Sequence, residues 1–266
     1  MSYNIRLDLA ADGINAWPNR RKELIGQVAL VRPDLVGMQE VVPGQRRDLI
    51  ASLPDYLFLG VARDDGRDSG EYSLLGVRRA AYRVRESGTF WLSETPDRPS
   101  KGWDASYRRI VTWARLDDRR SGKSLLVLNT HWDNDGRKAR EESAGLILSW
   151  LKTHGKKGDR LLLLGDFNAA LGEASMRRLL SAGFRDARSD DGFGPAATFN
   201  NFQLVPAPAD PIDHILAGPD WVVRRYWTVA QHIDGRPISD HYPIVADLRA
   251  GCLNRDAATA NRPIAP

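Results

Sequence analysis

Apolar positions along the chain follow two spacings, one typical of helices and one typical of strands. Apolar side chains three or four residues apart predict helices over residues 21–31, 45–52, 138–154 and 174–182. Short apolar runs bounded by Gly, Pro or Asp predict strands over residues 3–7, 35–39, 56–62, 72–77, 82–91, 110–116, 125–128, 161–164, 212–217, 222–229 and 242–248. The runs that are apolar throughout are typical of strands covered on both faces.

The order of these elements predicts one layered α/β or α+β domain. Two similar halves, each combining strands with flanking helices, suggest two sheets packed face to face with helices outside. No low-complexity linker or short repeat divides the chain, so we expect a single domain over residues 1–250. Residues 251–266 are rich in Ala, Asn and Pro, and we expect them to form a loose C-terminal tail.

Composition excludes several classes of protein. With 266 residues, of which 42% are hydrophobic and 27% charged, the chain has ordinary globular values. The single cysteine, Cys252, excludes an internal disulfide and a cysteine-based zinc cluster. No apolar run approaches the roughly 18 residues of a membrane-spanning helix, so we expect no transmembrane segment.

Net charge and the N-terminal residues say less than composition about the partners and the location of the protein. A net charge of +4 permits a polyanionic partner such as nucleic acid but does not indicate one. The first residues lack the basic-then-apolar pattern of an export signal. Because the chain begins inside a predicted strand, we expect a cytoplasmic protein if this N-terminus is complete and an exported one if an upstream signal has been removed. We expect a monomer.

Polar side chains gather where the predicted strands end. Six separate positions carry an acid, an amide or an imidazole, and they are Asn4, Glu40, His131, Asp166 with Asn168, Asp213, and Asp240 with His241. Strand ends in layered sheets form one rim, so we expect these groups to converge on one pocket.

Each position also has a structural explanation when taken alone. Asp166 and Asn168 flank Phe167, so both would point to the same side of an extended chain. The same Gly-Asp-Phe-Asn stretch is equally typical of a turn with side-chain caps. Glu40 is also compatible with an ordinary strand-end carboxylate, and a lone histidine is more often structural than catalytic.

The set as a whole indicates a cation. Burying several carboxylates without partners is costly, so a cluster of them implies a bound positive ion. Oxygen-rich ligands without thiolate suit Mg²⁺ or Mn²⁺, which also bind phosphate oxygens. An Asp–His pair adds a general base or a charge-stabilising group. The combination predicts metal-assisted attack of water on phosphorus.

These residues resemble the motifs of the endonuclease/exonuclease/phosphatase superfamily of metal-dependent phosphoesterases. The ordered set is Asn4, Gln39-Glu40, Thr130-His131, Gly165-Asp166-Phe167-Asn168, Asp213-His214 and Ser239-Asp240-His241, within a match from Tyr3 to Pro243. The resemblance implies a four-layer sandwich, with two mixed β-sheets packed face to face and helices on both outer faces. It implies that residues 1–250 form the catalytic domain.

The resemblance also implies roles for the metal-binding and water-activating groups. Glu40 is similar to the principal metal ligand, with Asn4 beside it. Asp166 resembles the residue that positions or deprotonates the attacking water, and Asn168 a contact to the phosphate or its leaving group. Asp240 resembles a residue that supports the metal or the neighbouring histidine.

The remaining implied roles concern charge on the phosphate. His241 resembles a contact to a phosphate oxygen, and His131 a second active-site histidine with Glu71 as its carboxylate partner. Asp213 resembles a carboxylate near the phosphate or a second cation. One departure is His214, because many relatives carry tyrosine or arginine after that Asp, so we expect His214 to face elsewhere.

The sequence leaves the substrate open. We prefer a phosphodiesterase or phosphatase acting on a small or lipid-linked phosphoester through one or two divalent cations, with Arg140 as a further phosphate contact. The first alternative is a Mg²⁺-dependent nuclease whose backbone contacts are Arg108-Arg109, Arg177-Arg178 and Arg224-Arg225. The second is a catalytically inactive binding protein on the same scaffold.

Overall fold

Two six-stranded sheets form the centre of the computed structural model, which describes residues 1–188 and 192–251. The first sheet has the order β11 (Trp221–Thr228), β14 (Ile244–Ala250), β1 (Ser2–Asn4), β2 (Leu35–Val41), β4 (Tyr72–Arg78) and β3 (Tyr56–Leu59). The second has the order β5 (Tyr82–Trp91), β6 (Ile110–Asp118), β7 (Ser124–His131), β8 (Arg160–Asp166), β10 (Asp213–Ala217) and β9 (Arg185–Asp186). Both sheets are mixed, because β1 pairs with β2 and β7 with β8 in parallel, while the other pairs are antiparallel.

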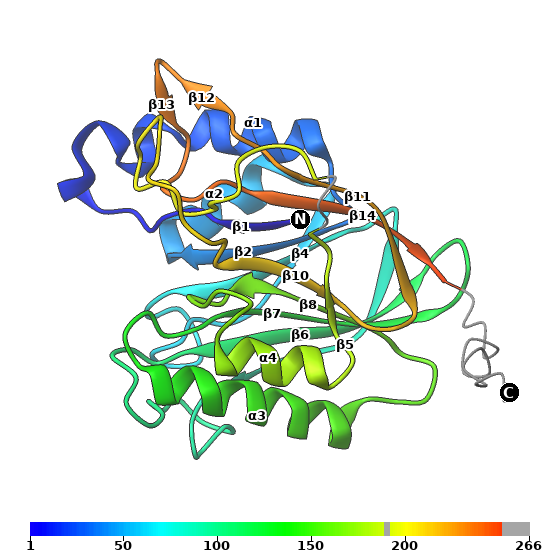
Figure 1. Cartoon of the computed structure of the whole chain (residues 1–266). Helices are drawn as coiled ribbons and strands as arrows, with labels where there is room; N and C mark the ends of the chain where they lie inside the picture. The colour runs from blue at the N-terminus through cyan, green and yellow to red at the C-terminus, as the bar shows by residue number, and fades with distance from the viewer. Residues whose placement is uncertain (189–191, 252–266) are drawn as a thin grey trace, which may run out of the picture.

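Helices cover the outer faces of both sheets, giving four layers (Figure 1). The helices α1 (Arg21–Val31) and α2 (Pro43–Ser52) lie over the first sheet, and α3 (Arg137–His154) and α4 (Ala174–Ser181) lie over the second. Three apolar clusters fill the spaces between the layers, and the middle one joins strands of both sheets. None of the helices in the described part of the chain is long and apolar enough to cross a lipid bilayer.

The two sheets also meet through a buried amide. Asn129 on β7 donates from Nδ2 to the carbonyl oxygens of Met38 (3.1 Å) and Leu74 (2.9 Å) in the first sheet. Its Oδ1 accepts a hydrogen bond from Gln39 Nε2 at 2.8 Å. The backbones come this close because residue 37 is glycine, where a Cβ atom would lie 2.5 Å from Asn129 Oδ1.

The predicted helices are confirmed, and the predicted strands need corrections at their ends. The first strand ends at Asn4, and not at residue 7, because Arg6 adopts a left-handed conformation with φ of 55°. The carbonyl groups of Ile5 and Arg6 then accept hydrogen bonds from the Arg20 guanidinium instead of from a strand. The third strand likewise ends at Leu59, before Gly60 with φ of 124°.

Five short elements were not expected from the sequence. They are the 3₁₀ helices η1 (Ala10–Asn15) and η2 (Trp17–Asn19), and the two-residue strands β9, β12 (His232–Ile233) and β13 (Arg236–Pro237). The sheets also divide the sequence differently from two successive halves, because β11 and β14 return to the first sheet. Apart from Gly251, the predicted tail over residues 251–266 lies outside the described residues.

Candidate active site

A cleft of about 650 Å³ lies where strand ends of the two sheets meet. It is lined by Arg6, Leu7, Leu9, Glu40, Arg63, Glu71, Tyr107, Arg109, His131, Asn134, Asp166, Asn168, Phe199, Ile212, Asp240 and His241. Seven of the nine predicted site residues are in that lining, and the other two, Asn4 and Asp213, hydrogen-bond to lining residues. The structure therefore brings the predicted set together.

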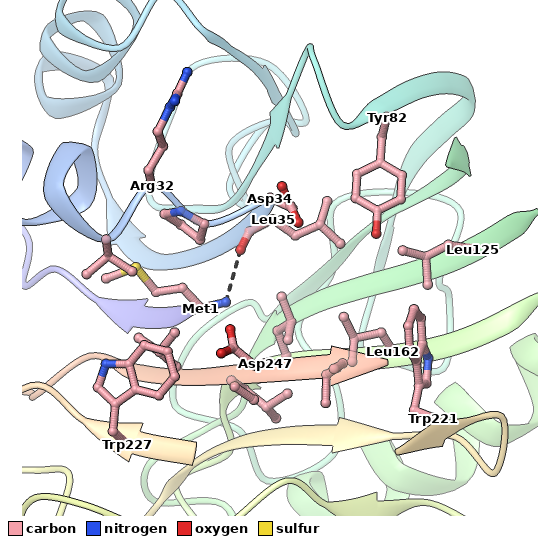
Figure 2. A pocket seen from close by; sticks show the side chains of 17 residues that line it. Met1, Arg32, Asp34, Leu35, Tyr82, Leu125, Leu162, Trp221, Trp227 and Asp247 are labelled. Atoms are coloured by element: carbon pink, nitrogen blue, oxygen red, sulfur yellow. Dashed lines mark hydrogen bonds between the residues drawn. The ribbon is translucent and has the colours of Figure 1, made fainter. Parts of the chain in front are cut away.

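A second cavity, of about 320 Å³, lies at the opposite end of the strands. Most of the residues that line it are apolar types. Figure 2 shows Trp221 and Trp227 among them, with the Met1 amine donating to the carbonyl oxygen of Leu35. None of the predicted site residues lines it. The converging acids and imidazoles make the cleft the candidate active site.

Glu40 enters the cleft from an irregular position in β2. The pairing of β2 with β4 shifts register between Met38 and Val41, and Glu40 has a left-handed φ of 61°. Non-glycine residues seldom adopt this conformation, and bulges of this kind redirect a side chain. The Glu40 carboxylate accepts hydrogen bonds from the Leu7 backbone N–H at 3.1 Å and from Asn4 Nδ2 at 2.9 Å.

Asn4 joins carboxylates of the two sheets. Its Nδ2 donates to Glu40 Oε1 at 2.9 Å and to Asp166 Oδ2 at 3.0 Å, while its Oδ1 accepts from the Arg6 backbone N–H at 3.0 Å. Asn4 is fully buried, so this contact fixes the spacing of the two acids. Its amide nitrogen faces them here, and its role as a direct metal ligand stays a prediction.

Asp166 lies between two imidazoles. Its Oδ2 is 3.6 Å from His131 Nε2 and 3.7 Å from His241 Nε2. Burial, together with the nearby Asp213 carboxylate, raises the pKa of Asp166 to about 7, although His241 and the Asn4 hydrogen bond oppose the rise. A carboxyl with such a pKa can accept a proton near neutral pH.

The two histidines differ in charge. Burial lowers the pKa of His131 well below its usual value, and the nearby Arg109 and Arg63 guanidinium groups lower it further. Burial also opposes the charged form of His241, but the Asp213 and Asp166 carboxylates outweigh it and raise the His241 pKa well above its usual value. His241 Nδ1 donates to Asp213 Oδ2 at 2.8 Å. The cleft thus has a neutral imidazole on one side of Asp166 and a cationic one on the other.

The predicted pair of His131 and Glu71 is close but not hydrogen-bonded. Glu71 Oε2 is 3.8 Å from His131 Nδ1, whereas Glu71 Oε1 is 2.7 Å from Arg63 Nη2. Burial raises the pKa of Glu71, and the Arg63 guanidinium opposes that rise. Arg63, and not His131, is therefore the direct partner of Glu71.

Asn168 lies in a turn and not in an extended segment. Its φ is 46°, and its backbone N–H donates to Asp166 Oδ1 at 2.9 Å. Its Nδ2 donates to the Trp132 carbonyl oxygen at 3.0 Å. Of the two sequence interpretations, the capped turn is confirmed and the extended chain is wrong, although both side chains do line the cleft.

Asp240 faces Glu40 across the acidic end of the cleft. Burial raises the pKa of Asp240 to about 6, with His241 opposing the rise and the Glu40 carboxylate adding to it. The nearest cation among the described residues is Arg6, whose Nη1 is 3.7 Å from Asp240 Oδ2. Two acids that interact in this way favour a shared positive ion.

Two arginines form a cationic wall that the site prediction did not include. Arg109 is buried, with Nε 3.3 Å from Asp133 Oδ2 and Nη2 donating to Asn134 Oδ1 at 2.8 Å. Its neighbour in the lining is Arg63. Arg109 lies just before β6 and not after a strand. Arg63 directly follows the predicted strand over residues 56–62, but the predicted set was limited to acids, amides and imidazoles.

Two other residues do not contribute to the cleft. Arg140, expected as a phosphate contact, donates to the carbonyl oxygens of Asp133 and Asn134 and lies outside the lining. His214 faces away as expected, with Nδ1 2.6 Å from Asp186 Oδ2 and Nε2 3.0 Å from the Ala169 carbonyl oxygen.

The donor atoms of the site fit a hard divalent cation. Ligand atoms of Asp166, Asp213 and His241 lie within 4.8 Å of one another, and Glu40 and Asp240 add carboxylates beside them. All of these donors except the imidazole are oxygens, and no thiolate lines the cleft. Because hard divalent cations prefer oxygen ligands, the carboxylates are the better ligands.

Comparison with known proteins identifies the family of this chain. The family model of the Endonuclease/Exonuclease/phosphatase family matches residues 1–241. A curated relative, the uncharacterized protein L388 of Acanthamoeba polyphaga mimivirus, is 28% identical over 57% of this chain and 59% of its own length.

Solved structures share the fold over nearly the whole chain. A family protein from Bacteroides thetaiotaomicron is 35% identical, with a TM-score of 0.89 over 93% of this chain and 95% of its own. A mannosyl-6-phosphatase of the same organism is also 35% identical, with a TM-score of 0.88 over 93% and 98% of the two chains. D. rerio TDP2, in complex with a single-stranded DNA product, shares the fold at 20% identity, with a TM-score of 0.73 over 94% and 97% of the chains. This chain belongs to the endonuclease/exonuclease/phosphatase family of metal-dependent phosphoesterases.

Proposed function

We propose that this chain hydrolyses a phosphomonoester of a small polar molecule with Mg²⁺ or Mn²⁺. The observation that carries the proposal is Asp166, a buried carboxyl with a pKa of about 7, held between a neutral and a cationic imidazole. This arrangement can take a proton from water on one side and stabilise charge on a phosphoryl group on the other. The mannosyl-6-phosphatase at 35% identity supports a phosphomonoester of a sugar as the substrate class.

The side chains divide the reaction between them. Glu40 and Asp240 would hold the cation, with Asn4 fixing Glu40 relative to Asp166. The bound cation would polarise a phosphoryl oxygen and offset charge on the leaving oxygen. Asp166 would orient and deprotonate the attacking water. His241, held by Asp213, would donate to a non-bridging oxygen as negative charge develops there.

The shape and charge of the cleft favour a small substrate over a nucleic acid. A volume of about 650 Å³ suits a small molecule. Of the three arginine pairs that a nuclease would use to follow a backbone, only Arg108-Arg109 contributes to the cleft, through Arg109. The pairs Arg177-Arg178 on α4 and Arg224-Arg225 on β11 do not line it. Nuclease activity and loss of catalysis are therefore the alternative outcomes of the test.

The test is a panel of substrates assayed with and without metal. We expect phosphate release from sugar phosphates with Mg²⁺ or Mn²⁺, no release in EDTA, and recovery when the metal is restored. Preferred cleavage of oligonucleotides, with affinity that falls steeply as salt rises, would instead identify a nuclease. A metal-loaded protein that binds phosphate compounds but cleaves no monoester, diester or oligonucleotide would refute the proposal.

Variants test the assigned residues. Glu40→Ala, Asp166→Ala and His241→Ala should each lower kcat by at least about 100-fold, the scale of removing one transition-state stabiliser. Asp97→Ala is the control, because this exposed carboxylate lies outside the cleft and should leave kcat unchanged. Near-normal turnover in all three site variants would show that the reaction occurs elsewhere.

A further inference from the structure

Two half-exposed aromatic rings stand at the entrance of the cleft on different sides of Asp166. Tyr107 is 51% exposed and Phe199 is 44% exposed, and both belong to the lining. Tyr107 lies beside the arginines that flank His131, whereas Phe199 lies beside His241. The rings therefore border the position of the scissile bond in the proposed reaction.

Contacts hold both rings in place while about half of each residue stays exposed. The guanidinium carbons of Arg63 and Arg109 lie 5.1 Å and 5.4 Å from the Tyr107 ring centre. The Tyr107 backbone N–H also donates to the buried Asp133 carboxylate at 3.1 Å. Contacts of this kind fix the ring without covering it, because they leave half of its surface in water.

Phe199 is fixed by contacts with the segment that precedes β14. Its ring centre lies 5.0 Å from that of His241, in an edge-to-face arrangement with an interplanar angle of 60°. The residues on both sides of it are tied down, because Tyr242 N–H donates to the Thr198 carbonyl oxygen at 2.8 Å and Asn200 N–H to that of Asp240 at 2.7 Å. Phe199 thus keeps a fixed place next to a proposed phosphate contact.

Fixed, half-exposed aromatic rings suit a flat apolar surface of a ligand. Leaving such rings in water gives up the free energy of burying them, and exposed apolar surface of this kind marks binding sites. Leu9, 37% exposed, adds a further apolar side chain to the entrance. The phosphate-binding groups lie deeper, so the ligand part that reaches the rings is the leaving group.

We propose that Tyr107 and Phe199 select phosphomonoesters whose leaving group is a ring, by stacking against its flat face. This inference rests on the proposed function and names the substrate class of the same site. A pyranose and a nucleoside both offer such a face, and an open-chain polyol does not. Stacking on one aromatic side chain typically changes binding by about 10-fold when the ring is removed.

The experiment compares three substrates of the Mg²⁺-loaded chain of 266 residues. They are a hexose 6-phosphate, the open-chain hexitol phosphate made by reducing it, and a nucleoside 5′-monophosphate. We expect kcat/KM for a ring substrate to exceed that for the hexitol phosphate by at least about 10-fold. Preference for the hexose phosphate identifies a sugar ring as the ligand, and preference for the nucleotide identifies a nucleoside.

Variants assign that preference to the two rings. Tyr107→Ala and Phe199→Ala should each lower the ratio of ring to open-chain kcat/KM by about 10-fold, whereas Tyr107→Phe and Phe199→Trp should retain it. Phe193→Ala is the matched control, since that phenylalanine is 79% exposed and lies outside the cleft. Circular dichroism and Tm establish whether each variant is folded. If an alanine variant is unfolded, Tyr107→Leu or Phe199→Leu, which keeps the bulk of the side chain, replaces it.

The outcomes separate this inference from the proposed function. Equal kcat/KM for ring and open-chain substrates, unchanged in the folded variants, would overturn the selection of rings and leave the phosphatase activity intact. Absence of phosphate release from all three substrates, while other phosphoesters are cleaved, would overturn both.

Discussion

Replacing Asn129 by alanine tests whether the buried amide holds the two sheets together. Asn129 is fully buried, and its side chain forms hydrogen bonds to Met38, Leu74 and Gln39 of the opposite sheet. Alanine would leave both carbonyl oxygens without this donor, while Gln39 Nε2 would keep only its longer hydrogen bond to Ser2 Oγ at 3.2 Å.

The expected loss of stability in Asn129→Ala follows from these three hydrogen bonds. A buried hydrogen bond contributes about 1 kcal/mol net, and a buried group left without a partner costs about 1–3 kcal/mol. Three such bonds give a decrease of about 3 kcal/mol or more in the free energy of unfolding. The free energy of unfolding of a typical domain is only about 5–15 kcal/mol, so this decrease would be large.

Urea unfolding followed by circular dichroism measures the effect. We expect a lower midpoint with an unchanged slope, because the surface exposed on unfolding stays the same. Asn19→Ala is the control, since this exposed asparagine donates one hydrogen bond, to the Gly13 carbonyl oxygen. A decrease below about 1 kcal/mol for Asn129→Ala would refute the reasoning, because the sheets would then dock without this contact.

Three further predictions concern a buried pair, a loop and the cation. Although burial lowers the pKa of His214, Asp186 raises it above its usual value, so this pair stabilises the fold fully below about pH 6.5 and loses its effect as pH rises through the folded pKa. Asp186→Asn should therefore lower the unfolding free energy more at pH 6 than at pH 9; an equal loss would contradict this. Asp133 accepts a hydrogen bond from the Tyr107 backbone N–H, so Asp133→Ala should reduce the preference for ring substrates. The ratio of kcat/KM for the ring and open-chain phosphates measures this preference, and an unchanged ratio would contradict the prediction. Mg²⁺ at 100 times its Kd should stabilise the native state by about 2.7 kcal/mol, seen as a rise in Tm that EDTA abolishes.

Local sequence patterns predict the helices and strands where local interactions determine them. The helix over residues 21–31 has the predicted bounds because its apolar spacing and the following Pro33 are both local signals. The first strand was predicted three residues too long because a distant side chain, Arg20, binds the carbonyl groups of Ile5 and Arg6. No pattern within residues 3–7 contains that information.

Some residues of the candidate site could likewise be predicted from local sequence, and others could not. Asp166 and His131 were found because they are the last residues of parallel strands, whose ends share an edge. Arg109 was not placed in the site because it precedes β6, and antiparallel pairing of β6 with β7 brings that start beside the end of β7. Strand direction depends on which strands become neighbours, so spacing along the chain does not predict it.

The order of the strands has a consequence for synthesis of the chain. All strands of the second sheet lie within residues 82–217, whereas the first sheet needs both residues 2–78 and residues 221–250. A nascent chain that has emerged as far as residue 217 contains Asp166 and Asp213 but lacks Asp240 and His241. Until β14 arrives, β1 has a neighbour on only one side. The ribosome therefore delivers the last cleft residues together with the strand that closes the first sheet, so the cleft is assembled only when that sheet is complete.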